Sequence, residues 1–133
     1  MGKSMNRLLF IKRMILGAAG IFIPFQQKVK GKKIFLSKFY IAGFSYYDGE
    51  SALKNLKEND NVIIKYEPNN PYDHRALEVY TTDGKKLGYV PRYENPIPSR
   101  LIRQNIQLAG EVEKINYDEA DWKKLKVRLY MII

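Results

Sequence analysis

Apolar and polar residues alternate with a period of two over most of the chain after residue 33, as in strands that bury one face. β-Branched and aromatic residues are frequent in these stretches, and turn-forming residues separate them. Two segments break the alternation: one has an apolar stripe at helical spacing, and the other opens with two prolines. The pattern predicts strands at residues 33–47, 61–67, 76–80, 86–90, 106–117 and 123–133, and short helices within 48–60 and 95–105.

This order of elements predicts a mainly β fold, a small six-stranded antiparallel barrel with two short helices. Gly43 marks the expected irregularity in the first strand, and Asp83 with Gly84 forms a strong hairpin turn. The last strand ends in VRLYMII, which is too apolar for an exposed sheet edge. We therefore expect it to pair inside the barrel.

The first 33 residues differ from the predicted barrel domain, residues 34–133. A basic segment precedes 12 uncharged residues, 14–25, which suit the apolar region of a signal peptide but are too few to span a bilayer. One interpretation is a signal-like leader or anchor that associates with a membrane through residues 7–25. The other is a helix that packs on the domain. The first makes the protein membrane-anchored or exported from a bacterial cell, and the second makes it cytoplasmic.

The formal charge of +9 is confined to one end of the chain. Residues 1–38 hold nine Lys and Arg and no acidic residue, whereas the other 14 Lys and Arg balance all 14 Asp and Glu. A neutral body argues against non-specific binding of a duplex through a broad basic face, and favours a local contact. The chain has no Cys and one His, which excludes thiolate chemistry, disulfides and a conventional structural zinc site. We expect no cofactor.

The loop EPNNPYDHRA, residues 67–76, carries the clearest chemical signal. Pro68 and Pro71 fix φ at two points, and the Asn and Asp side chains can accept hydrogen bonds from nearby amides, so we expect a stiff loop. Such a loop presents the flat face of Tyr72 for stacking on a base. Asp73 beside it can accept a hydrogen bond from a sugar hydroxyl or a base amine.

Other candidates have simpler structural interpretations. His74 has no second ligand or nucleophile beside it, and we expect it to be an exposed loop residue. The carboxylates within residues 111–121 lack a calcium-loop motif and suit a solvated strand face, so a metal-dependent hydrolase has little support. For Tyr46, Tyr47 and Trp122 we favour core positions over a stacking platform. The expectation is a binding module, not an enzyme.

Three motifs stand in order along the chain: FYIAGFSYY, EPNNPYDHRALEV and DGKKLGYVPR. Over residues 36–131 they resemble the HIRAN domain family. The resemblance implies an OB-like, six-stranded barrel that binds the free 3′ end of single-stranded DNA. It also implies a helicase or nuclease partner, since the sequence has no helicase motor motifs of its own.

The resemblance assigns roles to three residues of the loop. Tyr72 matches the aromatic that stacks on the terminal base, and Asp73 matches the carboxylate that accepts from the terminal 3′-hydroxyl. Asn70 matches a residue that helps to hold the end. These roles come from the family and not from the spacing.

Outside the loop, the resemblance implies a second pocket aromatic at Tyr40, a polar aromatic at Tyr89 and a cation near the phosphates at Arg92. Two positions depart from the family pattern, because Phe39 stands where a basic residue is expected and Ile41 where another Tyr is expected. The resemblance therefore implies a pocket that lacks one cation and one aromatic, which would weaken end binding.

Two functions remain open on the sequence. The first is a nucleic-acid-binding module that recognises DNA ends, with single-stranded DNA bearing a free 3′-hydroxyl as its ligand. The alternative is an envelope-associated binding domain whose pocket holds a peptide, a sugar or a small polar molecule, as the leader and the neutral body suggest.

Overall fold

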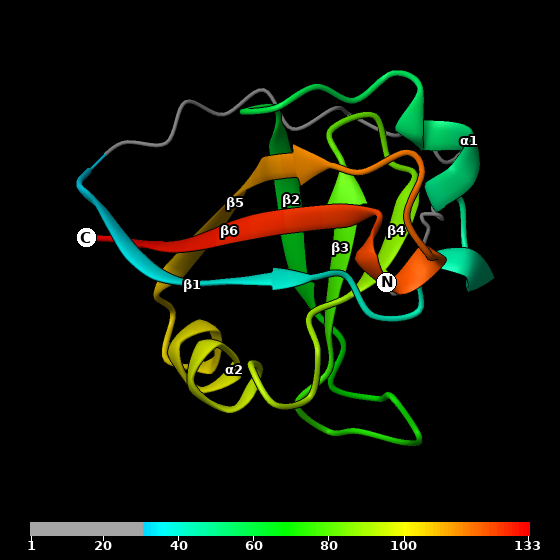
Figure 1. Ribbon diagram of the computed structural model, residues 1–133. Coiled ribbons are helices and arrows are strands. Elements are labelled where there is room, and N and C mark those ends of the chain that lie inside the picture. Colours follow the sequence, from blue (N-terminus) through cyan, green and yellow to red (C-terminus); the bar gives the residue numbers. More distant parts are fainter. Residues whose placement is uncertain (1–30) are drawn as a thin grey trace, which may run out of the picture.

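Six antiparallel strands form one sheet in residues 31–133, the part of the chain that this computed structural model describes (Figure 1). Their order in the sheet is β1-β6-β5-β2-β3-β4. The strands are β1 Lys33–Tyr40, β2 Asn61–Tyr66, β3 Leu77–Thr81, β4 Lys86–Tyr89, β5 Gln107–Ile115 and β6 Leu125–Ile132. The helices are α1 Gly49–Leu53 and α2 Pro96–Arg103, with 3-10 turns η1 Phe44–Tyr46 and η2 Asp121–Lys123.

The apolar last strand is internal, as predicted. β6 pairs with β1 on one side and with β5 on the other, which satisfies both rows of its backbone hydrogen-bonding groups. Its alternate residues Leu125, Val127 and Leu129 are at most 1% exposed and form the centre of the core. Burial of one face of the strand explains its period-two pattern.

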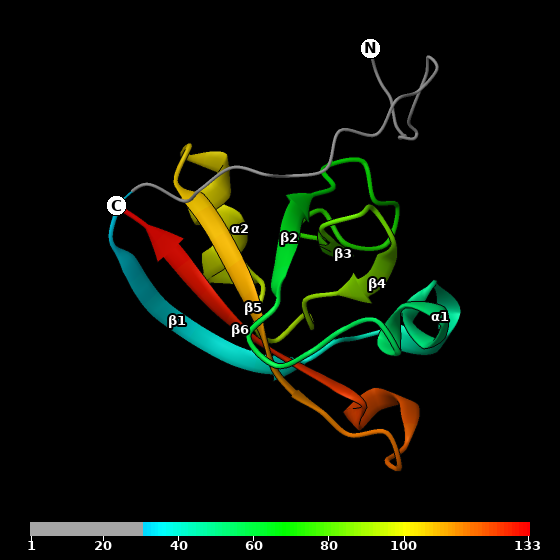
Figure 2. The ribbon, with the colours of Figure 1, turned by 90° about the horizontal axis from the view of Figure 1, so that it is seen from above.

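The sheet curls until its two edge strands approach each other (Figure 2). Continuous pairing does not close it, but a single bridge joins Ala42, just after β1, to Tyr89 at the end of β4. Each of these residues donates its N–H to the carbonyl of the other, with N···O distances of 2.9 Å. The arrangement is a partly open barrel of OB-like form, which confirms the predicted fold class.

The first strand is shorter than predicted. It ends at Tyr40, and Gly43 adopts the left-handed region with φ 72°, which turns the chain into η1. The predicted irregularity at Gly43 is therefore present, but the strand assignment of residues 41–47 was wrong. The turn directs Phe44 into the core and leaves Tyr46 84% exposed.

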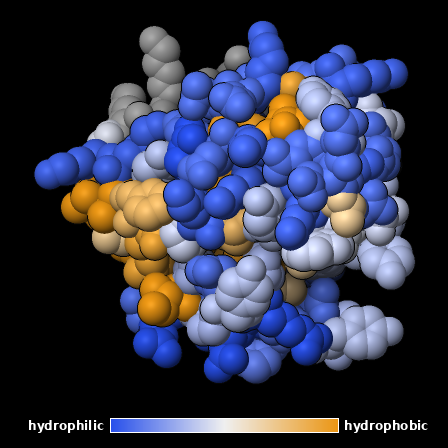
Figure 3. All heavy atoms as spheres, in the orientation of Figure 1, coloured by the Kyte–Doolittle hydropathy of each residue, from blue (hydrophilic) through white to orange (hydrophobic). Residues whose placement is uncertain are grey.

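The two helices lie at different ends of the curled sheet, with α1 beside β4 and α2 beside β5 (Figure 1). Ala52 and Leu53 bury the inner side of α1, and Pro98 and Ser99 that of α2. One face of the molecule is mostly hydrophilic, with an apolar area on the side of α2 (Figure 3).

The predicted leader lies outside the described residues, apart from residues 31–33. Within residues 31–133, no helix has the length and apolar character to cross a membrane. The two ends of the described chain meet, because Lys32 and Ile133 exchange backbone hydrogen bonds of 2.7 and 3.0 Å. They lie at the end of the sheet away from α1 in both views (Figures 1 and 2).

Gly88 tests how much the fold depends on the closing bridge. Its φ is +144°, and a Cβ there would lie 2.3 Å from the carbonyl oxygen of Ala42 and 2.6 Å from Cγ2 of Ile41. We expect Gly88→Ala to lower the free energy of unfolding by about 2–4 kcal/mol, because it strains the backbone and pushes the bridge apart. Urea unfolding measures this, with the exposed Ser45→Ala as control; equal stability of the two variants would contradict the role of the bridge.

Candidate functional site

The loop between β2 and β3 is held by its own polar groups, as expected. The Asn70 side-chain oxygen accepts hydrogen bonds from the backbone N–H of Tyr72 (2.8 Å) and of Asp73 (2.9 Å). The backbone N–H of Asn70 donates to the backbone carbonyl of Glu67, and the backbone N–H of Ala76 donates to the carbonyl of Asp73. The Asn at position 70 therefore sets the turn that presents the next three residues.

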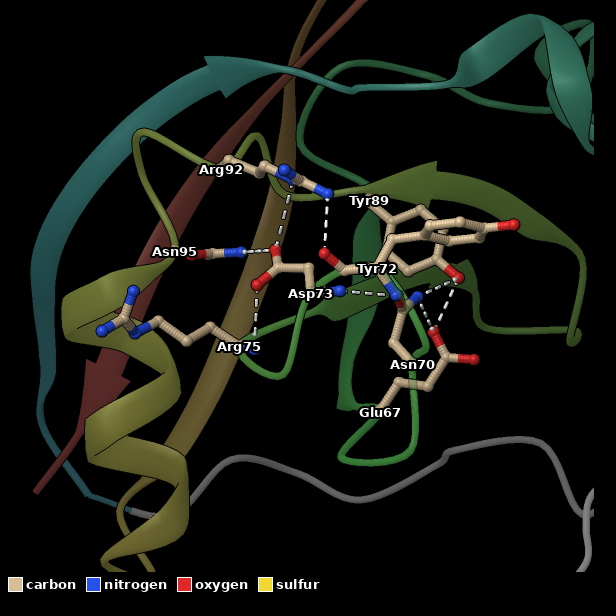
Figure 4. A network of polar contacts seen from close by, with 8 residues as sticks. All are labelled: Glu67, Asn70, Tyr72, Asp73, Arg75, Tyr89, Arg92 and Asn95. Carbon is tan, nitrogen blue, oxygen red and sulfur yellow. Dashed lines mark hydrogen bonds and ion pairs between the residues drawn. The ribbon is translucent and has the colours of Figure 1, made fainter.

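Asp73 lies at the centre of a second set of contacts, toward α2 (Figure 4). One carboxylate oxygen accepts a hydrogen bond from the backbone N–H of Arg75 (3.0 Å), and the other accepts from the side-chain amide of Asn95 (2.9 Å). Arg92 Nε lies 3.8 Å from that second oxygen, and Arg92 Nη2 donates to the carbonyl of Tyr72 (2.9 Å). Arg92 thus fixes both the carboxylate and the backbone that carries the aromatic ring.

These contacts keep Asp73 ionised. Burial alone would raise the pKa of Asp73, but the hydrogen bonds from Arg75 and Asn95 and the charge of Arg92 hold the pKa below its ordinary value. Its side chain is 18% exposed. A carboxylate has about four acceptor positions, so a ligand can still donate to it.

Tyr89 connects the other side of the loop to the sheet (Figure 4). Its hydroxyl donates to Glu67 (2.7 Å) and accepts from Lys86 Nζ (2.9 Å), and Glu67 also accepts from the Asn70 amide (2.9 Å). Lys86 forms a further ion pair with the buried Glu78 at 3.0 Å. Burial and the bond to Glu67 raise the pKa of Tyr89 well above its ordinary value, so Tyr89 remains a neutral donor.

A cavity of about 410 Å³ opens between this loop and the segment after β1. The ring of Tyr72 stands at it and is 83% exposed. Tyr47 approaches Tyr89 edge-on, with ring centroids 5.8 Å apart. The cavity is lined by Ala42, Gly43, Tyr47, Glu67, Asn70, Pro71, Tyr72, Asp73, Ala76, Tyr89, Val90 and Arg92.

Five of the six predicted site residues line this one cavity. They are Asn70, Tyr72, Asp73, Tyr89 and Arg92. Tyr40 is not among the lining residues. It lies two positions before Ala42, which does line the cavity, and its ring lies 5.3 Å from Lys126 Nζ.

The aromatic residues that we expected in the core are at the surface. Tyr46, Tyr47 and Trp122 are 84%, 40% and 64% exposed, so the preference for core positions was wrong. The cavity aromatic supplied from this part of the chain is Tyr47. The reason is the turn at Gly43, which a strand assignment through residue 47 does not include.

Phe39 and Ile41, which depart from the family pattern, do not face the cavity. Each is 2% exposed and lies in the hydrophobic core, because alternate residues of this segment point inward. Apolar residues at these two positions therefore remove no cation and no aromatic from the cavity, which corrects the expectation drawn from the alignment.

Sequence reasoning also missed Asn95 and Glu67. Asn before Pro is typical of a helix N-cap, but the Asn95 side chain makes no cap bond and donates to Asp73 instead. His74 is exposed, as expected. No group of three or more potential metal ligands occurs within residues 31–133.

The sequence model of the HIRAN domain family matches residues 34–132. The chain belongs to the HIRAN domain family. Among solved structures, a protein from Lactobacillus plantarum is 28% identical to this HIRAN domain, with a TM-score of 0.67 over 75% of this chain and 95% of the other. The HIRAN domain of human HLTF shares the fold at 21% identity, with a TM-score of 0.55 over 77% of this chain and 78% of the other.

Two curated relatives are helicase-like transcription factors. The protein from Oryctolagus cuniculus is 34% identical over 53 residues, and that from Mus musculus is 35% identical over 52 residues. These matches cover 40% and 39% of this chain. The matched segments make up about 5% of the length of either relative.

Replacing Asp73 with Asn tests the contacts at the centre of the site. The variant removes the ion pair with Arg92 and brings the side-chain amides of residue 73 and Asn95 together, so we expect a loss of about 1–2 kcal/mol in the free energy of unfolding at pH 7. Since the folded pKa lies below the ordinary 3.8, the contribution of the carboxylate is complete above that pH and disappears as pH falls through the folded pKa. Urea unfolding of both proteins between pH 7 and pH 3 measures this. A stability difference that stays constant over the range would contradict it.

Proposed function

We propose that this HIRAN domain is a nucleic-acid-binding module that recognises the end of single-stranded DNA with a free 3′-hydroxyl. The observation that supports this most strongly is the ionised Asp73 carboxylate beside the exposed Tyr72 ring and the Arg92 guanidinium in one cavity. An aromatic face, a hydroxyl acceptor and a cation are the groups that a terminal nucleotide needs. Domain-wide basicity is not required.

In this arrangement the terminal base stacks on Tyr72, and the 3′-hydroxyl donates its hydrogen to Asp73. Stacking on an aromatic side chain is worth about 1–3 kcal/mol per base and is tolerant of sequence. A 3′-phosphate would place negative charge against the carboxylate, with no hydrogen to donate. The same carboxylate therefore both accepts the correct end and rejects a phosphorylated one.

Arg92 serves the phosphate that precedes the terminal sugar. Its side chain is 72% exposed, and Nε and Nη2 are directed at Asp73 and at the Tyr72 carbonyl. Guanidinium has five N–H donors, so others remain for a phosphate oxygen. Arg92 then contributes to both the order of the loop and the charge of the site.

Catalysis on the bound end belongs to a partner in this proposal. The Tyr89 hydroxyl lies beside the Glu67 carboxylate in the cavity, but its raised pKa disfavours the phenolate that a nucleophile needs. The described residues include no metal-ligand cluster. A helicase or nuclease is the partner that fits a module for strand ends, in line with the helicase-like names of the curated relatives.

The role of Tyr72 is tested by truncation of its ring. We expect Tyr72→Ala to weaken binding of a thymidine oligonucleotide by about tenfold or more, because the stacking surface is lost. Tyr72→Phe keeps the surface and should bind like wild type. The ring is exposed, so both variants should unfold at the wild-type temperature. Fluorescence anisotropy gives the affinities, and unchanged binding by the Ala variant would exclude stacking at this residue.

End recognition is tested with two strands that differ only at the terminus. We titrate the full chain with the same thymidine oligonucleotide ending in a 3′-hydroxyl or in a 3′-phosphate. The hydroxyl form should bind at least about tenfold more tightly, since loss of a hydrogen bond to a carboxylate and repulsion between two like charges each cost roughly 1–3 kcal/mol. Equal affinity for the two strands would exclude the proposed function. Asp73→Ala is the matched variant, and it should remove most of the difference.

A further inference from the structure

A group of arginines continues from the cavity along α2. Between residues 84 and 110 the chain holds five Lys and Arg, and Glu94, which is half-buried, is the only acidic residue. Arg100 and Arg103 occupy the last turn of α2 and are exposed. Arg75, also exposed, follows the site loop. We call Arg75, Arg100 and Arg103 the arginine face.

The arginine face has no carboxylate partners among the described residues. The ion pairs in residues 31–133 involve other cations, such as Lys33 and Arg128 with Glu111 on the outer side of the sheet. Arg103 makes one contact, a hydrogen bond of 3.1 Å from Nε to the carbonyl of Ser99, which leaves its terminal N–H groups unused. These cations of the outer sheet have carboxylate partners, whereas those of the arginine face do not.

The arginine face is continuous with the cavity. Asn95 immediately precedes α2, is 2% exposed and donates to Asp73, so the start of the helix is fixed against the site. Arg75 donates its N–H to the same carboxylate, and its side chain extends away from the cavity on the side where α2 lies (Figure 4). From Asn95 to Arg103 the helix rises about 12 Å, which is long enough to contact more than one phosphate of a strand.

The exposed side of α2 also offers apolar contact. Tyr93 and Ile97 are 76% and 64% exposed, and Ile97 lies one turn before Arg100. Cations with an exposed aromatic are the combination that single strands bind without sequence preference. An anionic membrane surface could bind the same cations. Membrane binding does not explain why Asn95 and Arg75 attach the arginine face to Asp73 in the cavity.

We propose that the arginine face of α2 binds the phosphate backbone of the strand whose end occupies the cavity. The inference rests on the proposed function and extends the ligand from a terminal nucleotide to a single strand of several nucleotides. Arg92 then contacts the phosphate nearest the end, Arg75 follows it, and Arg100 and Arg103 contact phosphates farther along the strand. Residues 39–133 carry no net charge, so the local basic surface at the arginine face is not evident from the composition.

Cations in the last turn of a helix also interact favourably with its dipole, so a purely structural role must be separated from binding. The test variant is Arg100→Gln with Arg103→Gln in the full chain. The matched control is Lys54→Gln with Lys57→Gln, which removes two exposed cations with no ion pair in residues 31–133, near α1. Thermal unfolding of both variants measures the structural contribution separately.

Each protein is titrated with a twelve-thymidine strand and with dithymidine, both ending in a 3′-hydroxyl, at several salt concentrations. We expect the arginine variant to bind the long strand about fivefold or more weakly, with the slope of log affinity against log salt reduced by about 1.4 for two lost phosphate contacts. Its affinity for dithymidine, which reaches only the cavity, should be unchanged, and the control variant should retain the wild-type slope.

Two results would overturn the inference: equal binding of the long strand by the arginine variant and wild type, or an equal loss in the lysine control. A parallel titration with vesicles of anionic phospholipid gives a third such result: if the arginine variant lost vesicle binding but kept its affinity for the long strand, the arginine face would be assigned to a membrane. Failure of the proposed function has a different signature, since dithymidine would then bind equally well with a 3′-hydroxyl or a 3′-phosphate.

Discussion

The site depends on one backbone contact, the bridge between Ala42 and Tyr89 that brings the two edges of the sheet together. β1 and β4 are at opposite ends of the strand order, and the bridge joins the segment that follows β1 to the end of β4. A hydrogen bond of 2.9 Å from the Asp48 N–H to the Lys86 carbonyl supports the same contact. The bridge places Gly43 and Tyr47 on one side of the cavity and Tyr89 and Arg92 on the other. Gly88 allows the close approach, because any side chain there would meet the Ala42 carbonyl.

The groups that line the cavity are held in place by contacts within the protein. Asn70 fixes the backbone of Tyr72, Arg92 holds the Tyr72 carbonyl, and Asn95 holds Asp73. A binding site that is already in its bound conformation loses little conformational entropy on association. The ring of Tyr72 is exposed while its backbone is constrained, so it adds contact area without having to be positioned first.

Much of the fold could be predicted from the sequence, because period-two alternation follows directly from burial of one face of each strand. VRLYMII predicted an internal strand, and β6 is internal. The site loop was equally accessible, since proline, asparagine and aspartate act locally. All five residues named there and in GYVPR line one cavity, whereas Tyr40, from the first motif, is not among its lining residues.

The remaining parts depend on contacts between distant segments, which local pattern does not encode. The turn at Gly43 exposes Tyr46 and brings Tyr47 to the cavity, although FSYY reads as the end of a strand. Asn95 resembles a helix cap, but its side-chain amide donates a hydrogen bond to Asp73, 22 residues earlier in the chain. Phe39 and Ile41 were assigned to the pocket by resemblance to the family motif, whereas the alternation that begins in β1 places them in the core.

Lys32 and Ile133 lie side by side at one end of the sheet, which affects how the domain can be joined to other polypeptide. Polypeptide on either side of it enters and leaves at a single point, so the domain can be inserted into a larger protein without stretching its host. That point is remote from α1 in both views (Figures 1 and 2). A domain whose ends adjoin can be moved between host proteins as a unit, and the arrangement of its cavity moves with it.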